Sequence, residues 1–194
     1  MSAEQAKKEA RLLAKSRRAV AFEKFEGLGG GLFVQPFIQS IPIAPSAVVA
    51  AYVAKGDEAD PSVLTDILSG HGCKIVLPRV VGPDQPLTFC AWKRGDQLVP
   101  GPFGILEPKA SAPELVPDIV IVPLLAYGAQ GQRLGYGGGY YDRTLALLRA
   151  RNPAILVIGL AFAAQEVTHL AIESNDQALD WIVTERGATD FRKS

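Results

Sequence analysis

The chain has 194 residues, of which 48% are apolar and 21% charged, and its 20 basic side chains balance its 20 acidic ones. This length predicts one domain over 1–194, and the neutral balance excludes a global field that attracts nucleic acid or an anionic membrane. Cys73 and Cys90 are too few for a disulfide scaffold or a zinc ribbon, so we expect reduced core thiols. A charged start and short apolar runs predict a cytoplasmic protein without a membrane partner, and we expect a monomer.

Residues 3–22 contain good helix formers and no Gly or Pro, which predicts a helix. At about 100° per residue its side chains divide into a basic and an apolar arc. We expect the apolar arc to pack and the basic arc to face water or an anion, although a basic arc alone is more often a solvated surface. The basic arc is Lys7, Arg11, Lys15 and Arg18, and the apolar arc is Ala6, Ala10, Leu13 and Val20.

The next stretch, 27–46, is rich in Gly and Pro and has neither a strand period nor a helix period, so we expect an irregular connection. From residue 47 onward, short β-branched runs alternate with helical stretches. Alternation of this kind predicts an α/β fold, a three-layer, Rossmann-like open sheet of mostly parallel strands with helices on both faces. The predicted strands are 47–53, 74–78, 118–123, 154–160 and 181–184, with 87–92 and 96–99 as a strand pair added to the sheet.

Two helices are predicted within this alternation. Asp60 followed by Pro61 is a cap followed by a first-turn proline, which predicts a helix over about 61–70. A second helix is expected from about 140 to 151, because Asn152-Pro153 stops it.

The most informative stretch is 131–143, GQRLGYGGGYYDR, which places four glycines directly before the second helix. Glycines let backbone N–H groups converge on an oxyanion, and the helix N-terminus adds a favourable dipole. The stretch lacks GxxxxGK[ST], and Tyr140 stands where GxGxxG needs a third glycine, so both common nucleotide motifs are excluded. It therefore predicts a phosphate-binding loop of a different kind, formed by Gly135, Gly137, Gly138 and Gly139.

Charged residues flank this loop. Arg133 can supply the charge that a P-loop takes from its lysine, and its planar fork suits phosphate oxygens. Asp142, on the first turn of the helix, can hold a Mg²⁺ ion that bridges phosphates. The alternative is a glycine-rich surface turn with Tyr140 and Tyr141 in the core and Asp142 complementing the helix dipole.

Other polar residues remain open at this stage. Glu58 lies just past a predicted strand, where ligands meet open α/β sheets, and is otherwise a plain loop acid. Asp180, ahead of the last predicted strand, is by default a strand-flanking acid. His71 and His169 have no partners at ligand spacing, so we interpret both as structural.

The motif RLGYGGGYYD, preceded by a strand ending in VP and a variable turn, resembles the 5-formyltetrahydrofolate cyclo-ligase family. Other segments fall in order around it, and the resemblance covers about 1–20 and 47–188. The supporting segments are the KKEAR start with Lys7 and Arg11 four residues apart, AAYVAKGDE, KIVLPRV, FGILEP and LDWIVTERG.

This resemblance implies an ATP- and Mg²⁺-dependent closure of 5-formyltetrahydrofolate to 5,10-methenyltetrahydrofolate, with ADP and phosphate released. The formyl oxygen is phosphorylated, N10 attacks, and phosphate leaves. Such chemistry needs positioning and charge neutralisation more than a protein nucleophile, which agrees with the lack of a Ser-His or Cys-His arrangement.

The resemblance also implies roles for named residues. It assigns the reacting groups to Arg133 and Tyr140, and the metal to Asp142 and Asp180. The substrate set is Val53, Glu58, Trp92, Tyr136, Gly137, Gly138, Gly139 and Tyr140. The nucleotide set is Lys7, Arg11, Arg133, Leu134, Gly135, Tyr136, Gly137, Gly138, Gly139, Tyr140 and Tyr141.

Two functions of other classes compete with this reading. One is a non-catalytic nucleotide- or sugar-phosphate-binding module on a related α/β scaffold. The other is an RNA-binding protein that uses the basic first helix, but the neutral charge and the lack of interleaved aromatic residues argue against it.

Overall fold

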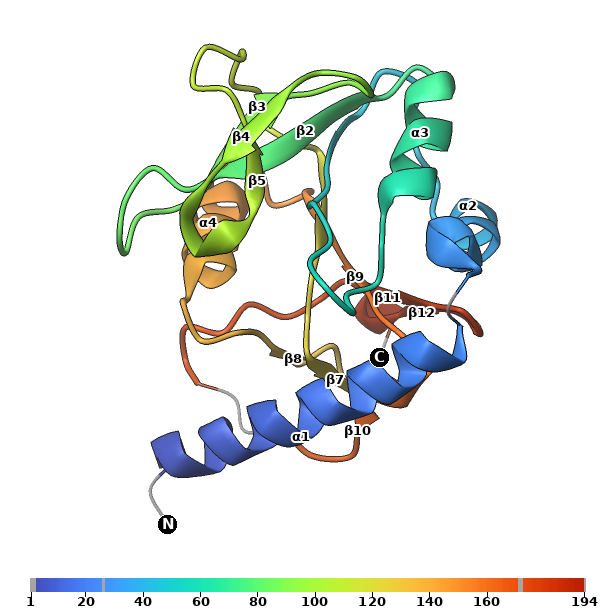
Figure 1. Cartoon of the computed structure of the whole chain (residues 1–194), viewed down its shortest axis with the longest axis vertical. Helices are drawn as coiled ribbons and strands as arrows, with labels where there is room; N and C mark the ends of the chain where they lie inside the picture. Colours follow the sequence, from blue (N-terminus) through green and yellow to red (C-terminus); the bar gives the residue numbers. More distant parts are fainter. Residues whose placement is uncertain (1–2, 26, 171–172, 194) are drawn as a thin grey trace.

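The computed structural model describes residues 3–25, 27–170 and 173–193. Its main sheet has the strand order β12-β11-β9-β6-β1-β2-β3 (Figure 1). The five inner strands run parallel, and the two edge strands pair antiparallel with their neighbours. The strands are β1 (Val48–Ala50), β2 (Lys74–Arg79), β3 (Thr88–Ala91), β6 (Ile119–Val122), β9 (Leu156–Leu160), β11 (Trp181–Thr184) and β12 (Gly187–Asp190).

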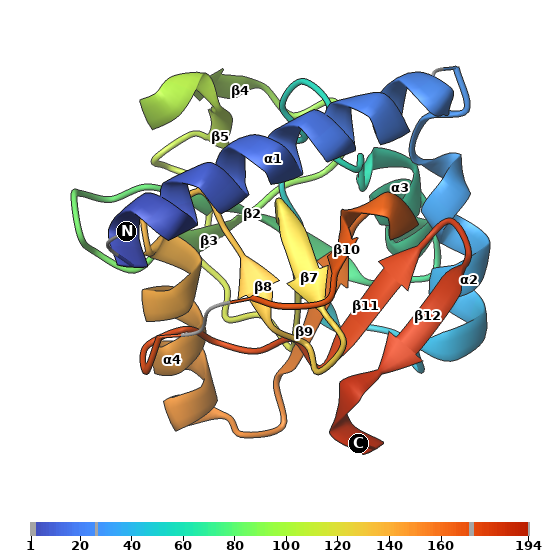
Figure 2. The same ribbon diagram turned by 90° about the horizontal axis from the view of Figure 1, so that it is seen from below.

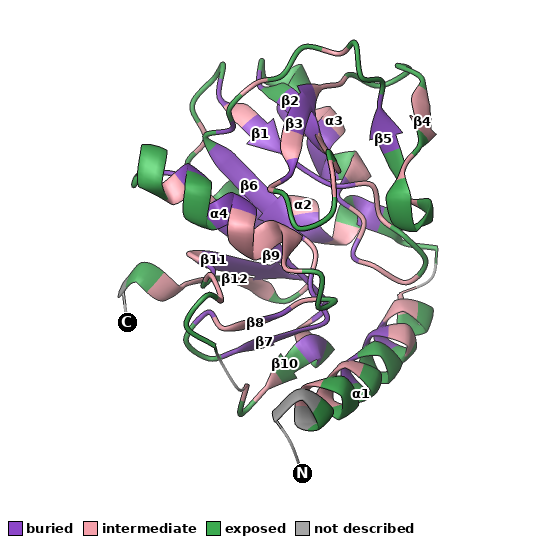
Figure 3. Cartoon of the chain, turned by 90° about the vertical axis from the view of Figure 1, so that its left-hand side faces the viewer, coloured by how far each residue is buried: buried purple, intermediate pink, exposed green. Residues whose placement is uncertain are grey.

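Helices cover both faces of this sheet, as Figure 1 and the buried strands of Figure 3 show. Successive strand residues point to opposite faces, so Val49 packs in the cluster that holds Leu64 of α3, whereas Val120 packs with Leu145 of α4. The predicted three-layer α/β fold is confirmed. The helices on the two faces are η1 (Gly29–Phe33), α2 (Val34–Ser40) and α3 (Ser62–Gly70) on one side and α4 (Tyr140–Arg151) on the other.

The first helix, α1 (Ala3–Lys24), lies across one end of the molecule (Figures 1 and 2). The helix itself is confirmed, but the expectation of which arc packs is wrong in part, because Ala10 of the apolar arc packs as predicted and Leu13 and Val20 do not. Leu13 and Val20 are 56% and 65% exposed, whereas Arg18 and Ala14 are buried. Lys7, Arg11 and Arg18 of the basic arc turn inward because they meet carbonyl and carboxylate groups there, as described below, whereas Lys15 stays exposed.

A small sheet supports α1 from beneath, with strand order β10-β7-β8. Ala14 of α1 packs with Leu125, Ala126 and Leu134. The strands are β7 (Ala126–Gly128), β8 (Arg133–Leu134) and β10 (Glu166–Val167), and β10 follows the short helix η3 (Ala163–Gln165).

The expectation for 27–46 is wrong in part, because η1 and α2 occupy residues 29–40. Phe33 and Phe37 bury completely in the core, and that packing stabilises helical turns in spite of the glycines. Position 30 requires glycine, because a Cβ there would lie 2.4 Å from the backbone oxygen of Asp60.

The predicted strand pair is also corrected. β3 joins the main sheet beside β2, but the second segment forms β4 (Leu98–Pro100), which pairs with β5 (Leu106–Pro108) in a separate ribbon. The turn between them is η2 (Pro102–Gly104).

The other predicted helices and strands agree with the structure. The five predicted parallel strands form, and α3 and α4 match their predicted ranges. Asp60 accepts a 2.8 Å hydrogen bond from the N–H of Ser62 at the start of α3. Cys73 and Cys90 are free and buried, and no helix within the described residues combines the length and apolar character that crossing a membrane requires. The last turn, η4 (Phe191–Lys193), follows β12.

Candidate active site

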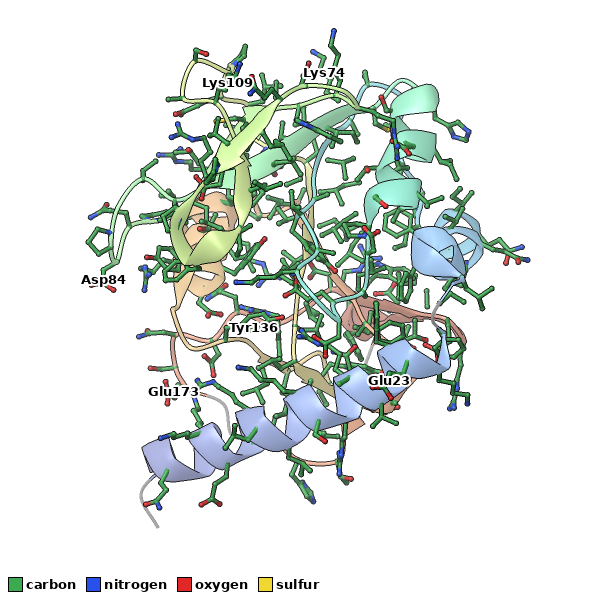
Figure 4. All side chains as sticks on the ribbon, in the orientation of Figure 1. Glu23, Lys74, Asp84, Lys109, Tyr136 and Glu173 are labelled. Atoms are coloured by element: carbon green, nitrogen blue, oxygen red, sulfur yellow. The ribbon has the colours of Figure 1, made fainter. Side chains whose placement is uncertain are left out.

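The site forms where the order of the strands reverses. From β1 the chain passes to β2 on one side, and β6 pairs with β1 on the other side. Ligands of open α/β sheets bind at such a point, beyond the carboxyl ends of the strands. The loop 51–60 leaves β1 at this edge, and α1 lies across it. Lys74, at the amino end of β2, lies at the far end of the molecule from α1 (Figure 4).

The glycine-rich loop 135–139 is part of this edge and leads directly into α4, as predicted. Gly137 and Gly139 adopt positive φ angles of 97° and 65°, a region that non-glycine residues rarely occupy. Residues 136–138 are exposed, so the backbone of the loop is accessible to a ligand.

Arginines from two helices lie against this loop. Arg11 of α1 donates a 3.2 Å hydrogen bond from Nε to the carbonyl of Gly135, and its guanidinium carbon lies 3.1 Å from the position of a Cβ on Gly137. Arg143 of α4 donates a 2.8 Å bond to the carbonyl of Gly138. A locally positive site therefore exists in a chain with no net charge.

Arg133 completes this cluster from β8. Its side chain is 4% exposed and donates a 2.5 Å bond to Oδ1 of Asp142. Within the part of the chain that the structure describes, the Nε atoms of Arg18, Arg133 and Arg143 are buried without a hydrogen-bond partner.

Lys7 lies one turn before Arg11 on the same face of α1, but its ammonium group is already paired. It lies 2.7 Å from Glu173 and 3.6 Å from Asp176. Figure 4 shows Glu173 beside the N-terminal half of α1. The structure thus brings Arg11, and not Lys7, into direct contact with the loop.

The centre of the site is a group formed by Arg18, Tyr136, Glu58 and Asp57. The Tyr136 hydroxyl donates to Glu58 and accepts from Arg18, and Arg18 also donates a 2.6 Å bond to Asp57. Figure 4 shows Tyr136 between α1 and the body of the protein. Glu58 is 11% exposed at its side chain, and its second oxygen accepts a 2.8 Å bond from the N–H of Lys55.

These contacts shift two pKa values. Burial lowers the pKa of Arg18 and is the largest single influence, but the hydrogen bonds to Asp57 and Tyr136 raise it above its ordinary value. Burial raises the pKa of Tyr136, and the negative charge of Glu58 raises it further. Arg18 therefore stays charged and Tyr136 stays protonated at neutral pH.

An aromatic wall borders the loop on the side of η2. The ring of Phe103 packs edge-on against Tyr140 at 5.8 Å, and Arg143 lies 5.0 Å over the same Tyr140 ring. Phe103 is 63% exposed and has a positive φ of 61°, and Lys55 donates a 2.5 Å bond to its carbonyl. A strained, exposed aromatic residue held beside a loop of this kind indicates a binding role.

The two predicted metal ligands lie apart. Asp142 accepts from Arg133 and from the N–H of Gln177, whereas Asp180 accepts from Arg149 and from the N–H of Val157 at the start of β9. Asp180 thus lies at the amino edge of the parallel strands, opposite to Glu58. No group of three His, Cys, Asp or Glu side chains at metal-binding distance occurs among the described residues.

Four further residues were predicted for the site, and the structure places them as follows. Val53 is half-buried in the loop after β1. Leu134 is buried in an apolar cluster, and Tyr141 is partly buried against another. Trp92 is hydrogen-bonded to Ile75 near the amino end of β2 and lines a pocket of about 310 Å³ against α3, so the structure does not bring it to the glycine-rich loop.

Sequence reasoning missed Arg18, Arg143 and Phe103 as site residues. Arg18 belongs to the basic arc of the first helix, and Arg143 is the last residue of the glycine-rich motif, so the sequence could have predicted both as site residues. Phe103 carried no signal, because its position depends on the turn between β4 and β5.

A glycine-rich loop surrounded by arginines, at the switch point of an open α/β sheet, is the kind of site at which α/β proteins bind phosphate groups. The chain matches the model of the 5-formyltetrahydrofolate cyclo-ligase family over residues 3–185, and it belongs to this family.

Individual relatives agree with this assignment. The 5-formyltetrahydrofolate cyclo-ligase of Escherichia coli K12 is 30% identical over 179 residues, which cover 89% of this chain and 96% of that protein. The Mycolicibacterium smegmatis protein of the same name is 31% identical over 192 residues, with 93% and 94% covered. The NMR structure of Aquifex aeolicus 5,10-methenyltetrahydrofolate synthetase has a TM-score of 0.78 at 27% identity and covers 97% of this chain and 94% of that chain.

Proposed function

We propose that this cyclo-ligase closes 5-formyltetrahydrofolate to 5,10-methenyltetrahydrofolate with consumption of ATP and assistance from Mg²⁺. The observation that carries the proposal is the contact of Arg11 with the glycine-rich loop, directly beside the group formed by Glu58, Tyr136 and Arg18. This arrangement provides an anion-binding part and a part with hydrogen-bond acceptors side by side.

The reaction has two chemical steps. The formyl oxygen attacks the γ-phosphorus of ATP, the bond to the β-phosphate oxygen breaks, and ADP leaves. N10 then attacks the activated formyl carbon, the C–O bond breaks, and phosphate leaves together with the proton that N10 loses. Neither step requires a protein nucleophile, because the difficulty lies in bringing two anionic partners together in the correct orientation.

ATP phosphates fit the loop and its arginines. A Cβ on Gly137 or Gly139 would meet the guanidinium groups of Arg11 or Arg143, so glycine leaves the backbone accessible beside positive charge. Arg133 would neutralise charge that develops during transfer, and Lys7 would add to the positive potential. Leu134, Gly135 and Tyr141 would contribute backbone groups, since two of these side chains are packed.

Asp142 fits the role of a Mg²⁺ ligand. Mg²⁺ in phosphoryl-transfer sites is usually held by one or two carboxylates together with substrate phosphates, so a cluster of acids is not needed. The Asp142 carboxylate is on the first turn of α4, next to the loop, and is 24% exposed. When bound, the ion would neutralise phosphate charge. For Asp180, the bonds to Arg149 and Val157 favour a structural role, and its contact with the metal stays a prediction.

The folate fits the opposite part of the site. Glu58 would accept hydrogen bonds from the amide and amine edge of the pterin, and Val53 would lie beside it. Tyr136 would hold Glu58 in place by its hydroxyl contact. Tyr140 and the exposed ring of Phe103 would flank the aminobenzoyl part, because this wall adjoins the loop where transfer takes place.

The test is incubation of the purified protein with 5-formyltetrahydrofolate, ATP and Mg²⁺, with the methenyl product followed by absorbance. Product should form only when ATP and a divalent metal are both present. Equal turnover without ATP would contradict the proposal. Binding of ATP without any folate-dependent hydrolysis would favour a non-catalytic nucleotide-binding module instead.

A further inference from the structure

The ribbon formed by β4 and β5 carries Phe103 at its tip, yet it lies outside the main sheet. β5 lies against β2, and Figure 3 shows the ribbon at one side of the sheet, mostly in the colours of intermediate and exposed residues. Among residues 98–108, all of which the structure describes, Glu107 and Pro108 are the two that are buried. Because an isolated pair of strands is at best marginally stable, the contacts of these two residues decide where the tip lies.

Glu107 brings a charged side chain to this buried position. The side chain is 7% exposed, its Oε1 accepts a 3.1 Å hydrogen bond from the N–H of Val80, and its Oε2 lies 3.9 Å from Nε of Arg79. A buried carboxylate is costly unless it is paired and hydrogen-bonded. Arg79 is the last residue of β2, and Val80 follows it. The carboxylate therefore fastens the base of the ribbon to a strand of the main sheet.

The opposite strand leaves space for this carboxylate at Gly101. A Cβ there would lie 2.3 Å from Cδ of Glu107 and 2.6 Å from its Oε1. The φ angle of Gly101 is −105°, which any residue can adopt, so glycine is required for space and not for its conformation. Gly101 also donates a 2.8 Å bond to the carbonyl of Ile105, which closes the turn that carries Phe103.

Lys55 holds the tip of the ribbon from the other side. Its ammonium group donates to the carbonyl of Phe103, and its backbone N–H donates to Glu58. The φ of 61° at Phe103 is a strained conformation, which persists only where the surrounding structure fixes it. Lys55 is exposed, whereas Glu107 is buried, so the firmer of the two constraints on the ribbon is at its base.

We propose that Glu107 is a positioning residue, which fixes the β4–β5 ribbon and thereby keeps Phe103 against Tyr140. The inference rests on the proposed function, in which these two rings flank the aminobenzoyl part of the folate. The effect of Glu107 on folate binding should then pass through Phe103.

Double-mutant kinetics tests whether Glu107 acts through Phe103. Glu107→Ala should raise the KM for 5-formyltetrahydrofolate by about 3- to 10-fold, as the loss of one aromatic contact does, and leave the KM for ATP unchanged. In a Phe103→Ala background the same change should have no further effect on the KM for folate. Glu107→Gln should keep that KM near the wild-type value, because its amide oxygen can still accept from Val80.

Glu185→Ala is the matched control. The Glu185 carboxylate is 10% exposed, accepts a 2.8 Å bond from the N–H of Ala163 and lies 3.7 Å from Arg186, so it resembles Glu107 in burial and in partners. This variant should lose similar stability in a thermal melt and keep the wild-type KM for folate. Gly101→Ala, which displaces the Glu107 carboxylate without removing it, should reproduce the effect of Glu107→Ala and replaces that variant if it does not fold.

Hydrogen exchange tests the ribbon without any substrate. The backbone amides of 98–108 should exchange about tenfold faster in Glu107→Ala than in the wild-type protein, because the ribbon opens more often when its base is released. Exchange of the same amides should be unchanged in Glu185→Ala.

Three results would overturn the inference. An unchanged KM for folate in Glu107→Ala would mean that other contacts hold the ribbon. An equal rise of this KM in the Phe103→Ala background would mean that Glu107 does not act through the ring. Unchanged exchange over 98–108, while the wild-type protein forms product, would overturn the inference alone. A wild-type protein that forms no product would overturn the proposed function together with it.

Discussion

Two glycine-rich pentapeptides in this chain differ at a single residue, yet they form different structures. Residues 27–31 read GLGGG and residues 135–139 read GYGGG. The first runs into a 3₁₀ helix that packs against α3, and the second remains an exposed turn before α4. Glycine content alone therefore does not make a phosphate-binding loop.

The surroundings of the two segments account for the difference. In the first, Gly30 is buried against the backbone of Asp60, while Gly27 and Gly29 are exposed and line a pocket together with phenylalanines of α1 and η1. The second is enclosed by arginines from α1, β8 and α4. In the first segment Gly30 permits close packing, and in the second the glycines leave backbone groups open beside positive charge.

The largest effect is expected at Gly137. A Cβ there would lie 3.1 Å from the guanidinium carbon of Arg11, and φ is 97°. Gly137→Ala should therefore displace both the loop and Arg11, with kcat/KM for ATP falling by about 100-fold, because small misplacements at a reacting centre are costly. Steady-state kinetics measures this effect.

Gly31→Ala is the matched control for this change. Gly31 has no atom within 4 Å of its Cβ position, and its φ is not positive. Kinetics should stay at the wild-type level, and stability should be unchanged or slightly raised. If Gly137→Ala also kept wild-type kinetics, the two segments would not differ in function as we argue.

The next effect concerns stability. Gly30→Ala places a Cβ 2.4 Å from the Asp60 carbonyl oxygen, and backbone cannot move away as a flexible side chain can. Unfolding in urea should show a loss of about 1–3 kcal/mol, as overpacking usually does. Turnover by the folded fraction should change far less than in Gly137→Ala. Unchanged stability would mean that the first segment is not held against α3.

The two α1 cations should differ from one another. Arg11 contacts the loop, whereas Lys7 is paired with Glu173 and Asp176. Arg11→Ala should weaken ATP binding by about 10- to 100-fold, in line with a charge-assisted hydrogen bond, and Lys7→Ala should weaken it less. Calorimetry compares both with Lys8→Ala, which alters an exposed lysine. Equal losses for Lys7 and Arg11 would indicate that the acids release Lys7 when nucleotide binds.

The sequence predicted most of the fold because the β-branched runs and helix boundaries are local signals. The 131–143 motif also identified the loop, since its glycines, Arg133 and the start of α4 are contiguous. The packing face of α1 was predicted wrongly in part. Its buried face carries Arg11 and Arg18, whose partners are Gly135 and Asp57, and hydrophobic periodicity does not register charges that are satisfied by distant parts of the chain.

Residues that depend on tertiary contacts were the least predictable. Phe103 reaches the site through a turn with positive φ, and Trp92 lies at the opposite edge because β3 runs antiparallel to β2. The 27–46 stretch shows no period because its helical turns are short and rich in glycine. Its phenylalanines were visible in the sequence, but their arrangement around Phe162 depends on packing between distant segments.

The substitution with the smallest expected effect makes the two segments identical in sequence. Tyr136→Leu converts GYGGG to GLGGG and removes the hydroxyl that joins Arg18 to Glu58. Loss of these hydrogen bonds should raise the KM for folate by about 2- to 10-fold, while arginines still hold the loop open.

The pKa of Tyr136 in the folded protein lies above its ordinary value of 10.0, so the unfolded chain releases this proton first as the pH rises. Stability is therefore lost above pH 10, and the variant should lose it less steeply. Thermal melts from pH 7 to alkaline pH measure the slope, and Tyr127→Phe is the control, because burial raises the pKa of Tyr127 to about 12 on β7, in the small sheet beneath α1. The control should flatten the alkaline slope without changing the KM for folate. An unchanged KM and slope in Tyr136→Leu would mean that the hydroxyl is solvated, and that the residue between the glycines does not distinguish the two segments.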